Sequence, residues 1–198
     1  PPRIATPELD QETSVDITII GGGFAGQSAA HRIADLDPSA SVVILEAGLV
    51  GNGPAGRNSG FMIDLPHDLS SDDYAGSGAE QDKAHIAHNR IAIDYARSLA
   101  AKLSIPQEAF DPCGKINAAA TEAGDKHNQV FGDYLASIGE ATTLLSREDM
   151  KALTGIDFYS SGLHAPGTVM LQPPAYLRAL ADELPKTVTL YENSPVQS

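Results

Sequence analysis

Hydrophobic and polar residues follow one another in blocks that predict a β–α–β unit near the start of the chain. The apolar run 15–20 leads into a glycine-rich turn, a helix-forming segment covers Gln27 to Ala34, and a second apolar run covers Ser41 to Leu45. A strand, a helix and a second strand in this order predict parallel strands joined by a crossover helix. Apolar residues at helical spacing predict the face that the helix turns towards the sheet: Ala25, Ala29, Ile33 and Leu36.

After this unit, helices and short strands alternate along the rest of the sequence. Helices are predicted over residues 77–103, 122–138, 146–155 and 173–184. Strands are predicted over residues 115–120, 142–145 and 187–191, with one or two more between 162 and 171. The polar, proline-rich residues 1–14 predict an extended arm on the surface.

Local signals indicate the faces and ends of these helices. Ser146, three residues before Asp149, resembles the start of a capping box, and Pro173 with Pro174 is typical of a first helical turn. The stripe predicted to be buried on the longest helix comprises Ala84, Ala87, Ile91, Tyr95, Leu99 and Leu103. The inward residues predicted for the helix 122–138 are Val130, Phe131, Tyr134, Leu135 and Ile138.

Charge and composition narrow the class of protein. A formal charge of −13 argues against nucleic acid or an anionic membrane as a partner. A single cysteine excludes an internal disulfide and a cysteine metal cluster. No apolar run approaches the length of a membrane span, and the first residues lack the apolar core of a signal peptide. These features predict a cytoplasmic protein.

Two kinds of chemistry, metal binding and hydrolysis, receive little support. His85 and His88 stand three residues apart on the longest predicted helix, with Asp82 nearby. The two histidines either bind a metal or lie on a solvated helix surface. The solvated surface is favoured, and no metal site is predicted. The sequence contains no Gly-x-Ser-x-Gly elbow, so a hydrolase has no support.

The glycine-rich turn carries the main chemical signal. Gly21, Gly23 and Gly26 form Gly-x-Gly-x-x-Gly between the first strand and its helix, and Glu46 follows the second strand. The first glycine permits a tight turn, the second lets a pyrophosphate approach the backbone, and the third allows close packing of helix on sheet. A carboxylate at the position of Glu46 accepts hydrogen bonds from an adenosine ribose. The pattern predicts dinucleotide binding and leaves NAD and FAD open.

A second glycine-rich stretch, residues 47–62, is too long for a simple connection between strand and helix. Loops of this length are functional or disordered. Arg57, which follows Gly56 in this loop, is either a surface side chain or an anion contact, and the anion contact is favoured.

Residues 53–60, GPAGRNSG, resemble the GASGRNSG stretch of the D-amino-acid-oxidase-like FAD-dependent oxidoreductases, and in particular of the γ-glutamylputrescine oxidase-like amine oxidases. The later segment 162–184 is also similar to that family, so the resemblance covers essentially the whole chain. It implies FAD as the cofactor. It also implies an α/β fold, in which a Rossmann-like FAD-binding domain carries part of an antiparallel-sheet substrate domain.

The resemblance also implies roles for individual residues. The pyrophosphate contacts would be Gly21, Gly23, Phe24, Ala25 and Gly26, and Glu46, followed by Ala47, would bind the adenosine ribose. The residues beside the pyrophosphate and ribityl chain would be Arg57, Asn58, Ser59 and Gly60. Phe61 and Met62 would reach the isoalloxazine, and the backbone of Val196 would read the adenine. No catalytic residue is implied.

Two departures from the family pattern concern the second loop. Ala55 replaces a small hydroxyl residue, which removes one possible phosphate hydrogen bond. Some relatives carry a histidine there that bonds covalently to the flavin. This loop has Arg57 and no histidine, so FAD is expected to bind without a covalent link.

The expected activity is oxidation of the C–N bond of a primary or secondary amine, or of an amino acid, to an imine. A flavin dehydrogenase of a hydroxy acid and a non-catalytic FAD-binding subunit of a split enzyme are the alternatives. The expected divisions are an arm (1–14), the first part of the FAD-binding domain (15–105), a substrate-domain portion (106–172) and a return to the FAD-binding domain (173–198). The fold is expected to be incomplete without a C-terminal remainder or a second chain.

Overall fold

The structure is a computed structural model that describes residues 5–65 and 78–197. The chain divides into two compact units. The first comprises the residues up to Gly60 together with Ala96–Phe110 and the residues from Leu171 onward, and the second comprises Phe61–Tyr95 and Asp111–Met170. The predicted functional division at residues 105 and 172 stays a prediction.

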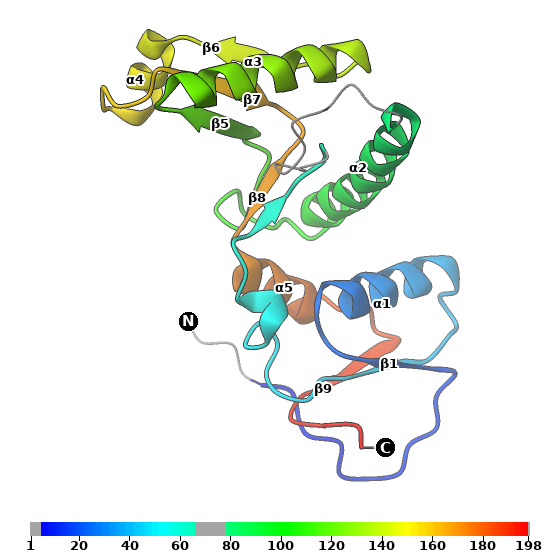
Figure 1. The fold of residues 1–198 in the computed structure, drawn as a ribbon. Helices are drawn as coiled ribbons and strands as arrows, with labels where there is room; N and C mark the ends of the chain where they lie inside the picture. The colour runs from blue at the N-terminus through cyan, green and yellow to red at the C-terminus, as the bar shows by residue number, and fades with distance from the viewer. Residues whose placement is uncertain (1–4, 66–77, 198) are drawn as a thin grey trace. The chain divides into compact units, whose positions relative to one another are not determined.

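The first unit is built on a parallel sheet of strands β1 (Ile17–Ile20), β2 (Val42–Leu45) and β9 (Val188–Tyr191), in the order β1-β2-β9. The strands are aligned so that Ile19 lies beside Ile44 and Ile44 beside Leu190. Helix α1 (Phe24–Leu36) connects β1 to β2, and α5 (Pro173–Asp182) precedes β9 (Figure 1). The predicted β–α–β unit is therefore confirmed.

The core of this unit lies between the sheet and the two helices. Its buried members come from α1, β2, the loop after β2, α5 and β9: Ala30, Ala34, Val42, Ile44, Val50, Leu177, Ala181, Val188 and Leu190. The face predicted for α1 was right only at Ile33, which packs against this core. Ala29 and Leu36 are exposed, and the buried positions are Gln27, Ala30, His31 and Ala34. Two of these are polar, so a search for apolar spacing missed them.

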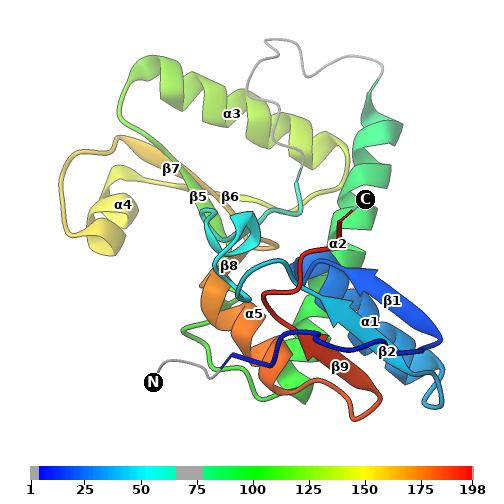
Figure 2. The same cartoon turned by 90° about the horizontal axis from the view of Figure 1, so that it is seen from below.

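The described part of the N-terminal arm, residues 5–14, has no helix or strand. It runs along the face of the sheet opposite to α1 and α5 (Figures 1 and 2). The amide of Thr6 and the amide of Leu9 donate hydrogen bonds to Glu192 and Ser194, so the arm is bound to the segment that follows β9.

The second unit contains antiparallel strands. Strand β7 (Ser161–Ala165) pairs with β5 (Lys115–Ala119) and with β6 (Thr143–Leu145). Another sheet has the order β3 (Phe61–Met62), β8 (Val169–Leu171) and β4 (Phe110–Asp111). The predicted strand region 162–171 is thus two strands. Helix α3 (Glu122–Ser137) packs on the β5-β7-β6 sheet, with Phe131 and Leu135 buried against Leu163.

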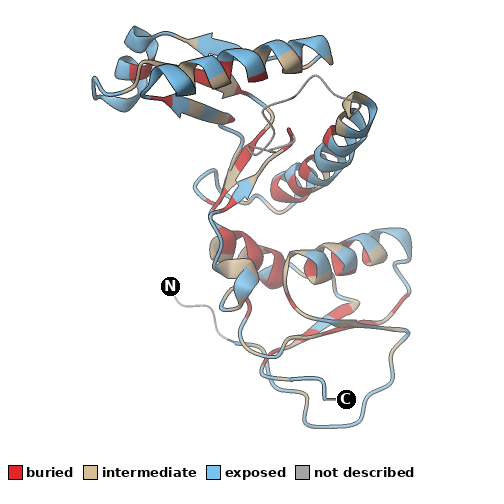
Figure 3. Cartoon of the chain, viewed as in Figure 1, coloured by how far each residue is buried: buried red, intermediate tan, exposed pale blue. Residues whose placement is uncertain are grey.

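Two predicted helix faces require correction. Helix α2 (Ala79–Lys102) buries Ile86 and Ile93, whereas Ile91 of the predicted stripe is 67% exposed. Figure 3 shows the buried positions along one side of α2. In α3, Val130 is exposed although it was predicted to face inward. The predicted start of α2 at residue 77 lies outside the described residues.

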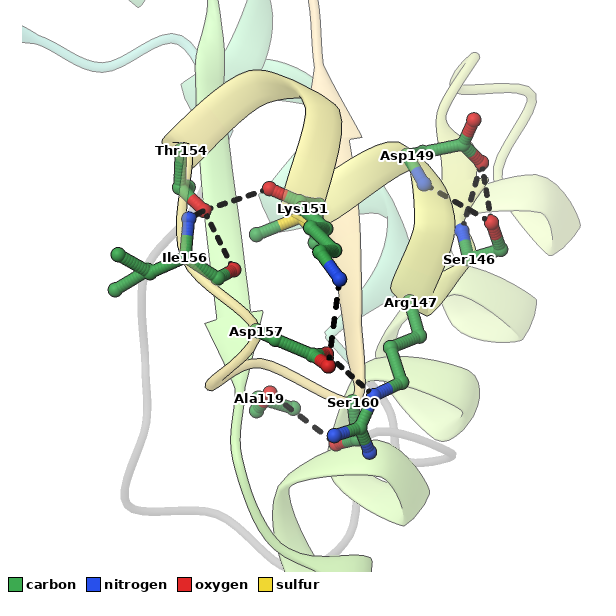
Figure 4. Close-up of polar contacts among 10 residues, drawn as sticks. Ala119, Ser146, Arg147, Asp149, Lys151, Thr154, Ile156, Asp157 and Ser160 are labelled. Atoms are coloured by element: carbon green, nitrogen blue, oxygen red, sulfur yellow. Dashed lines mark hydrogen bonds and ion pairs between the residues drawn. The ribbon is translucent and has the colours of Figure 1, made fainter.

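Helix α4 (Arg147–Thr154) has the predicted capping box (Figure 4). The Ser146 hydroxyl accepts from the Asp149 amide, and the Asp149 carboxylate accepts from the Ser146 amide at 2.9 Å. Gly155 ends the helix in the left-handed conformation, with φ of 74°. Both ends of this helix were therefore fixed by local sequence.

Candidate dinucleotide-binding site

The glycine turn joins β1 to α1 and has the geometry that its sequence predicts. Gly21 has φ of 99°, a conformation that side chains rarely adopt, and its amide donates to the carbonyl of Leu45 at 2.8 Å. A Cβ placed on Gly26 would lie 1.9 Å from the carbonyl oxygen of Gly21. Gly26 is therefore required for α1 to pack against the turn, whatever ligand is bound.

The first turn of α1 presents free backbone donors. Gly23 is the N-cap and has no side chain to accept from the helix, and the first turn contains no acidic residue. The first N–H groups of a helix have no intrahelical partner, and the helix dipole adds partial positive charge there. Gln27 braces the turn from inside, since its Nε2 donates to the carbonyl of Gly22 at 2.8 Å. The predicted contacts Phe24 and Ala25 belong to this first turn.

Glu46 lies directly after β2 and reaches the glycine turn. Its Oε2 accepts from the amide of Gly22 at 2.8 Å, and its Oε1 accepts from the amide of Gly48 at 3.0 Å. These two bonds fix the orientation of the carboxylate. A carboxylate has about four lone-pair sites, so two remain available for ribose hydroxyls. Ala47, beside Glu46, is exposed.

The second loop contains a short 3-10 turn, η1 (Pro54–Gly56), which approaches the glycine turn. A Cβ placed on Gly23 would lie 3.3 Å from the Cβ of Ala55, so the two loops are close enough to contact one ligand. The N-cap of η1, Gly53, also lacks a capping side chain. The alanine that departs from the family pattern therefore lies beside the predicted pyrophosphate position.

The predicted loop residues differ in their contacts. Asn58 holds the loop together, because its Nδ2 donates to the carbonyl of Ala55 at 2.7 Å and its Oδ1 accepts from the amide of Gly60 at 2.9 Å. Arg57 and Ser59 are exposed, and Arg57 has no ion pair with the residues that the structure describes. Gly60 has φ of 78°, and a Cβ there would lie 2.1 Å from the carbonyl oxygen of Leu171.

The remaining predicted residues lie elsewhere. Phe61 and Met62 form β3, which belongs to the second unit, and Phe61 is 49% exposed. Val196 lies in the segment after β9 and is 51% exposed. The contacts of these three residues with a flavin stay predictions, as does the contact of every other predicted site residue.

Sequence reasoning missed Glu192, which follows β9 as Glu46 follows β2. Its side chain is 1% exposed, and its Oε1 accepts from the amide of Val50 at 2.7 Å. An acidic residue directly after a predicted parallel strand was the available signal, because the carboxyl ends of parallel strands bind ligands in such folds.

The second unit contains a different buried carboxylate, Asp64. Its Oδ2 accepts from Nε and Nη2 of Arg90, the latter at 3.0 Å, and Arg90 also pairs with Glu140. Glu140 and Asp64 together raise the pKa of Arg90. A Cβ on Gly167 would lie 1.9 Å from Asp64 Oδ2, so a side chain there would displace the Asp64 carboxylate.

Metal-binding clusters are absent from the described ranges 5–65 and 78–197, in which no three His, Cys, Asp or Glu residues gather. His85 and His88 are exposed on α2, and Asp82 accepts a hydrogen bond from Tyr134. Burial and that carboxylate raise the pKa of Tyr134 to about 12. None of the helices formed by described residues combines the length and apolarity needed to cross a bilayer.

The first unit fits a dinucleotide with a pyrophosphate and an adenosine ribose. The fit rests on the uncapped N-terminus of α1, the lack of a side chain at Gly23, and the fixed carboxylate of Glu46 with its free lone pairs. Backbone N–H groups at a helix start are a general anion site. The arrangement can therefore hold an anion and a ribose side by side.

Comparisons with known proteins agree with this geometry. Residues 16–198 match the family described as FAD dependent oxidoreductase. A probable oxidoreductase OrdL of Haemophilus influenzae is 29% identical over 201 residues, covering 96% of this chain and 44% of that protein. Gamma-glutamylputrescine oxidoreductase of Escherichia coli is 36% identical over 55 residues, which is 28% of this chain and 12% of that protein.

Among solved structures, glycine oxidase from Geobacillus kaustophilus has a TM-score of 0.69 at 19% identity, covering 90% of this chain and 46% of that one. The chain thus spans less than half the length of these relatives. The α/β fold class with an FAD-binding fold, expected from the sequence, is confirmed. The match over residues 16–198 shows that the chain belongs to the DAO family of FAD-dependent oxidoreductases, whose cofactor is FAD.

Proposed function

We propose that this protein oxidises the C–N bond of a primary or secondary amine, or of an amino acid, to an imine. The observation that carries the proposal is the cofactor site of the first unit, in which the start of α1 and the Glu46 carboxylate are fixed beside each other. The similar proteins named glycine oxidase and gamma-glutamylputrescine oxidoreductase support a nitrogen-bearing substrate.

In this proposal the residues of the first unit bind and orient the cofactor. The N–H groups at the start of α1 contact the pyrophosphate, Glu46 accepts from the ribose, and Arg57 supplies a cation that no described residue neutralises. When bound, FAD supplies the two-electron oxidation, and water hydrolyses the product imine. Phe61 and Met62 contact the ring, and Val196 contacts the adenine.

The cofactor is proposed to bind without a covalent link. The loop that would carry a linking histidine has Arg57 and no histidine between residues 47 and 62. Acid or heat denaturation of the yellow protein should release a flavin spectrum into the supernatant. Yellow colour that stays with the precipitate would refute this part of the proposal.

The substrate class is tested by anaerobic reduction of the full-length protein. Primary amines, secondary amines and amino acids should bleach the flavin absorbance near its visible maximum, and 2-hydroxy acids should not. Bleaching by hydroxy acids alone would replace the proposal with the hydroxy-acid dehydrogenase alternative. Bleaching by none of these compounds would favour a non-catalytic FAD-binding subunit.

We further propose that a C-terminal remainder or a second chain completes the fold. Among residues 5–65 and 78–197, β1 pairs with β2 on one side only, and Ile20 in β1 is 71% exposed. An unpaired apolar edge strand is an aggregation hazard that folded proteins cover. Residues 1–198 expressed alone should be aggregated or free of flavin, whereas a soluble, yellow and active monomer of this length would refute the proposal.

A further inference from the structure

The N-terminal arm and the cofactor site are connected through Glu192. On one side, Glu192 Oε2 accepts from the amide of Thr6 at 2.7 Å and from its hydroxyl at 3.2 Å. On the other, Oε1 accepts from the amide of Val50 at 2.7 Å. The carboxylate is 1% exposed, so donors from the arm and from the loop after β2 stabilise one buried charge.

A second set of bonds extends this connection to the glycine turn. The amides of Asn193 and Ser194 donate to the carbonyls of Gly48 and Glu46, both at 2.9 Å. The side chain of Glu46 in turn accepts from the amide of Gly22 at 2.8 Å. The arm adds a further bond, since the amide of Leu9 donates to Ser194 Oγ at 2.9 Å.

These bonds form one continuous path within the first unit, from the arm through Glu192 and Ser194 to Glu46 and Gly22. A buried carboxylate that loses a donor retains the cost of its burial, so its surroundings rearrange or admit water. Loss of the arm would therefore release the residues that follow β9, and with them the turn that fixes Glu46.

We propose that the arm retains the cofactor, and that Glu192 is a positioning residue which holds Glu46 in the orientation that binds the adenosine ribose. The inference rests on the proposed cofactor site. It assigns to the arm a function in affinity for FAD. It also predicts that the effect is confined to the adenosine end of the cofactor, because the path reaches Glu46 and no residue proposed to contact the flavin ring.

The test compares FAD with FMN, which carries the same ring and one phosphate but lacks the adenosine. Apoprotein is prepared from the full-length protein, from a variant lacking residues 1–9 and from Glu192→Gln. Dissociation constants for both ligands are measured by flavin fluorescence, and thermal midpoints of the apoproteins are recorded. Glu8→Ala is the matched control, because Glu8 is an exposed residue of the same arm.

Both variants should raise the FAD dissociation constant about tenfold, the loss expected for a hydrogen bond to a charged group. The FMN dissociation constant of both variants should stay unchanged. The Glu8→Ala protein should keep the FAD and FMN constants of the unmodified protein. An unchanged FAD constant in both variants would overturn the inference. So would parallel weakening of FAD and FMN with a lower apoprotein midpoint, since that pattern indicates a general structural role. Failure of the unmodified apoprotein to bind FAD would instead refute the proposed cofactor site itself.

Discussion

Replacing Gly23 by valine should remove FAD binding and leave the protein folded. The backbone at Gly23 has φ of −82° and ψ of −167°, an extended conformation that any residue adopts. The nearest atom to a new Cβ would be the Cβ of Ala55, at 3.3 Å. The backbone conformation therefore accepts a side chain here if Ala55 moves by a few tenths of an ångström, and the added methyl groups occupy the space through which the pyrophosphate approaches the first turn of α1.

The substitution should change the stability of the fold much less than the affinity for FAD. Loss of glycine as N-cap lowers the unfolding free energy by about 1 kcal/mol. The lower chain entropy of the unfolded state raises it by about 0.5 kcal/mol. The unfolding free energy should thus change by no more than about 1 kcal/mol. Losing two charge-assisted hydrogen bonds from the helix start costs about 3 kcal/mol or more, which corresponds to roughly a hundredfold weaker binding.

Gly26→Ala provides the structural contrast. Its new Cβ would lie 1.9 Å from a backbone oxygen, so α1 must shift, at a cost of about 1–3 kcal/mol for overpacking. Ala29→Val, on the exposed face of α1, is the control for added size. Apoprotein stability in urea and flavin content after purification are measured for all three variants. Normal flavin content in a folded Gly23→Val protein would show that the phosphates bind elsewhere.

Three further predictions concern stability. Burial lowers the pKa of His31, so the unfolded state takes up a proton that the folded state excludes. The unfolding free energy measured in urea should therefore fall as pH decreases below about 6.5, by at most about 1.4 kcal/mol per pH unit, and His31→Gln should flatten this slope. Arg90→Met leaves the buried Asp64 unpaired and should lower the unfolding free energy in urea by about 2 kcal/mol. Arg147→Met, at an exposed ion pair, should lower it by less than about 1 kcal/mol. Equal losses in the two variants would contradict the argument. Ser146→Ala should lower the thermal midpoint and Ser146→Asp should restore it, since aspartate also caps; an unchanged midpoint in Ser146→Ala would show that the cap adds no stability.

The order and type of the elements could be predicted because their signals are local. Ser146 and Asp149 lie three residues apart, and Pro173 stands at the first position of α5. The turn at Gly21 and its contact with Gly26 lie within a single β–α connection. Signals of this kind do not depend on what packs against the element, so they can be read before the fold is known.

The buried faces of helices were harder to predict, because packing partners decide them. His31 is buried although it is polar, since its Nε2 lies 3.1 Å from the carbonyl oxygen of Leu180 in α5. Gln27 is buried because it braces the carbonyl of Gly22. In α2 the predicted Leu99 is buried, but the predicted Ile91 is exposed and Ile86 and Ile93 are buried instead. In α1 two of the buried residues are therefore polar side chains with a specific partner, whereas in α2 one apolar face was exchanged for another.

The two glutamates that follow β2 and β9 show how far sequence spacing determines a site. Both lie at the carboxyl edge of the same parallel sheet, as their positions after the strands predict. Glu46 was identified because it stands at the position of an acidic residue in the Gly-x-Gly-x-x-Gly pattern, and its partner Gly22 lies in the same β–α–β unit. Glu192 depends on the amide of Thr6, which comes from the opposite end of the chain, and no spacing rule connects the two. The main-chain bonds of Asn193 and Ser194 to Gly48 and Glu46 connect the two glutamate segments, so a site built on Glu46 depends on residues from both ends of the chain.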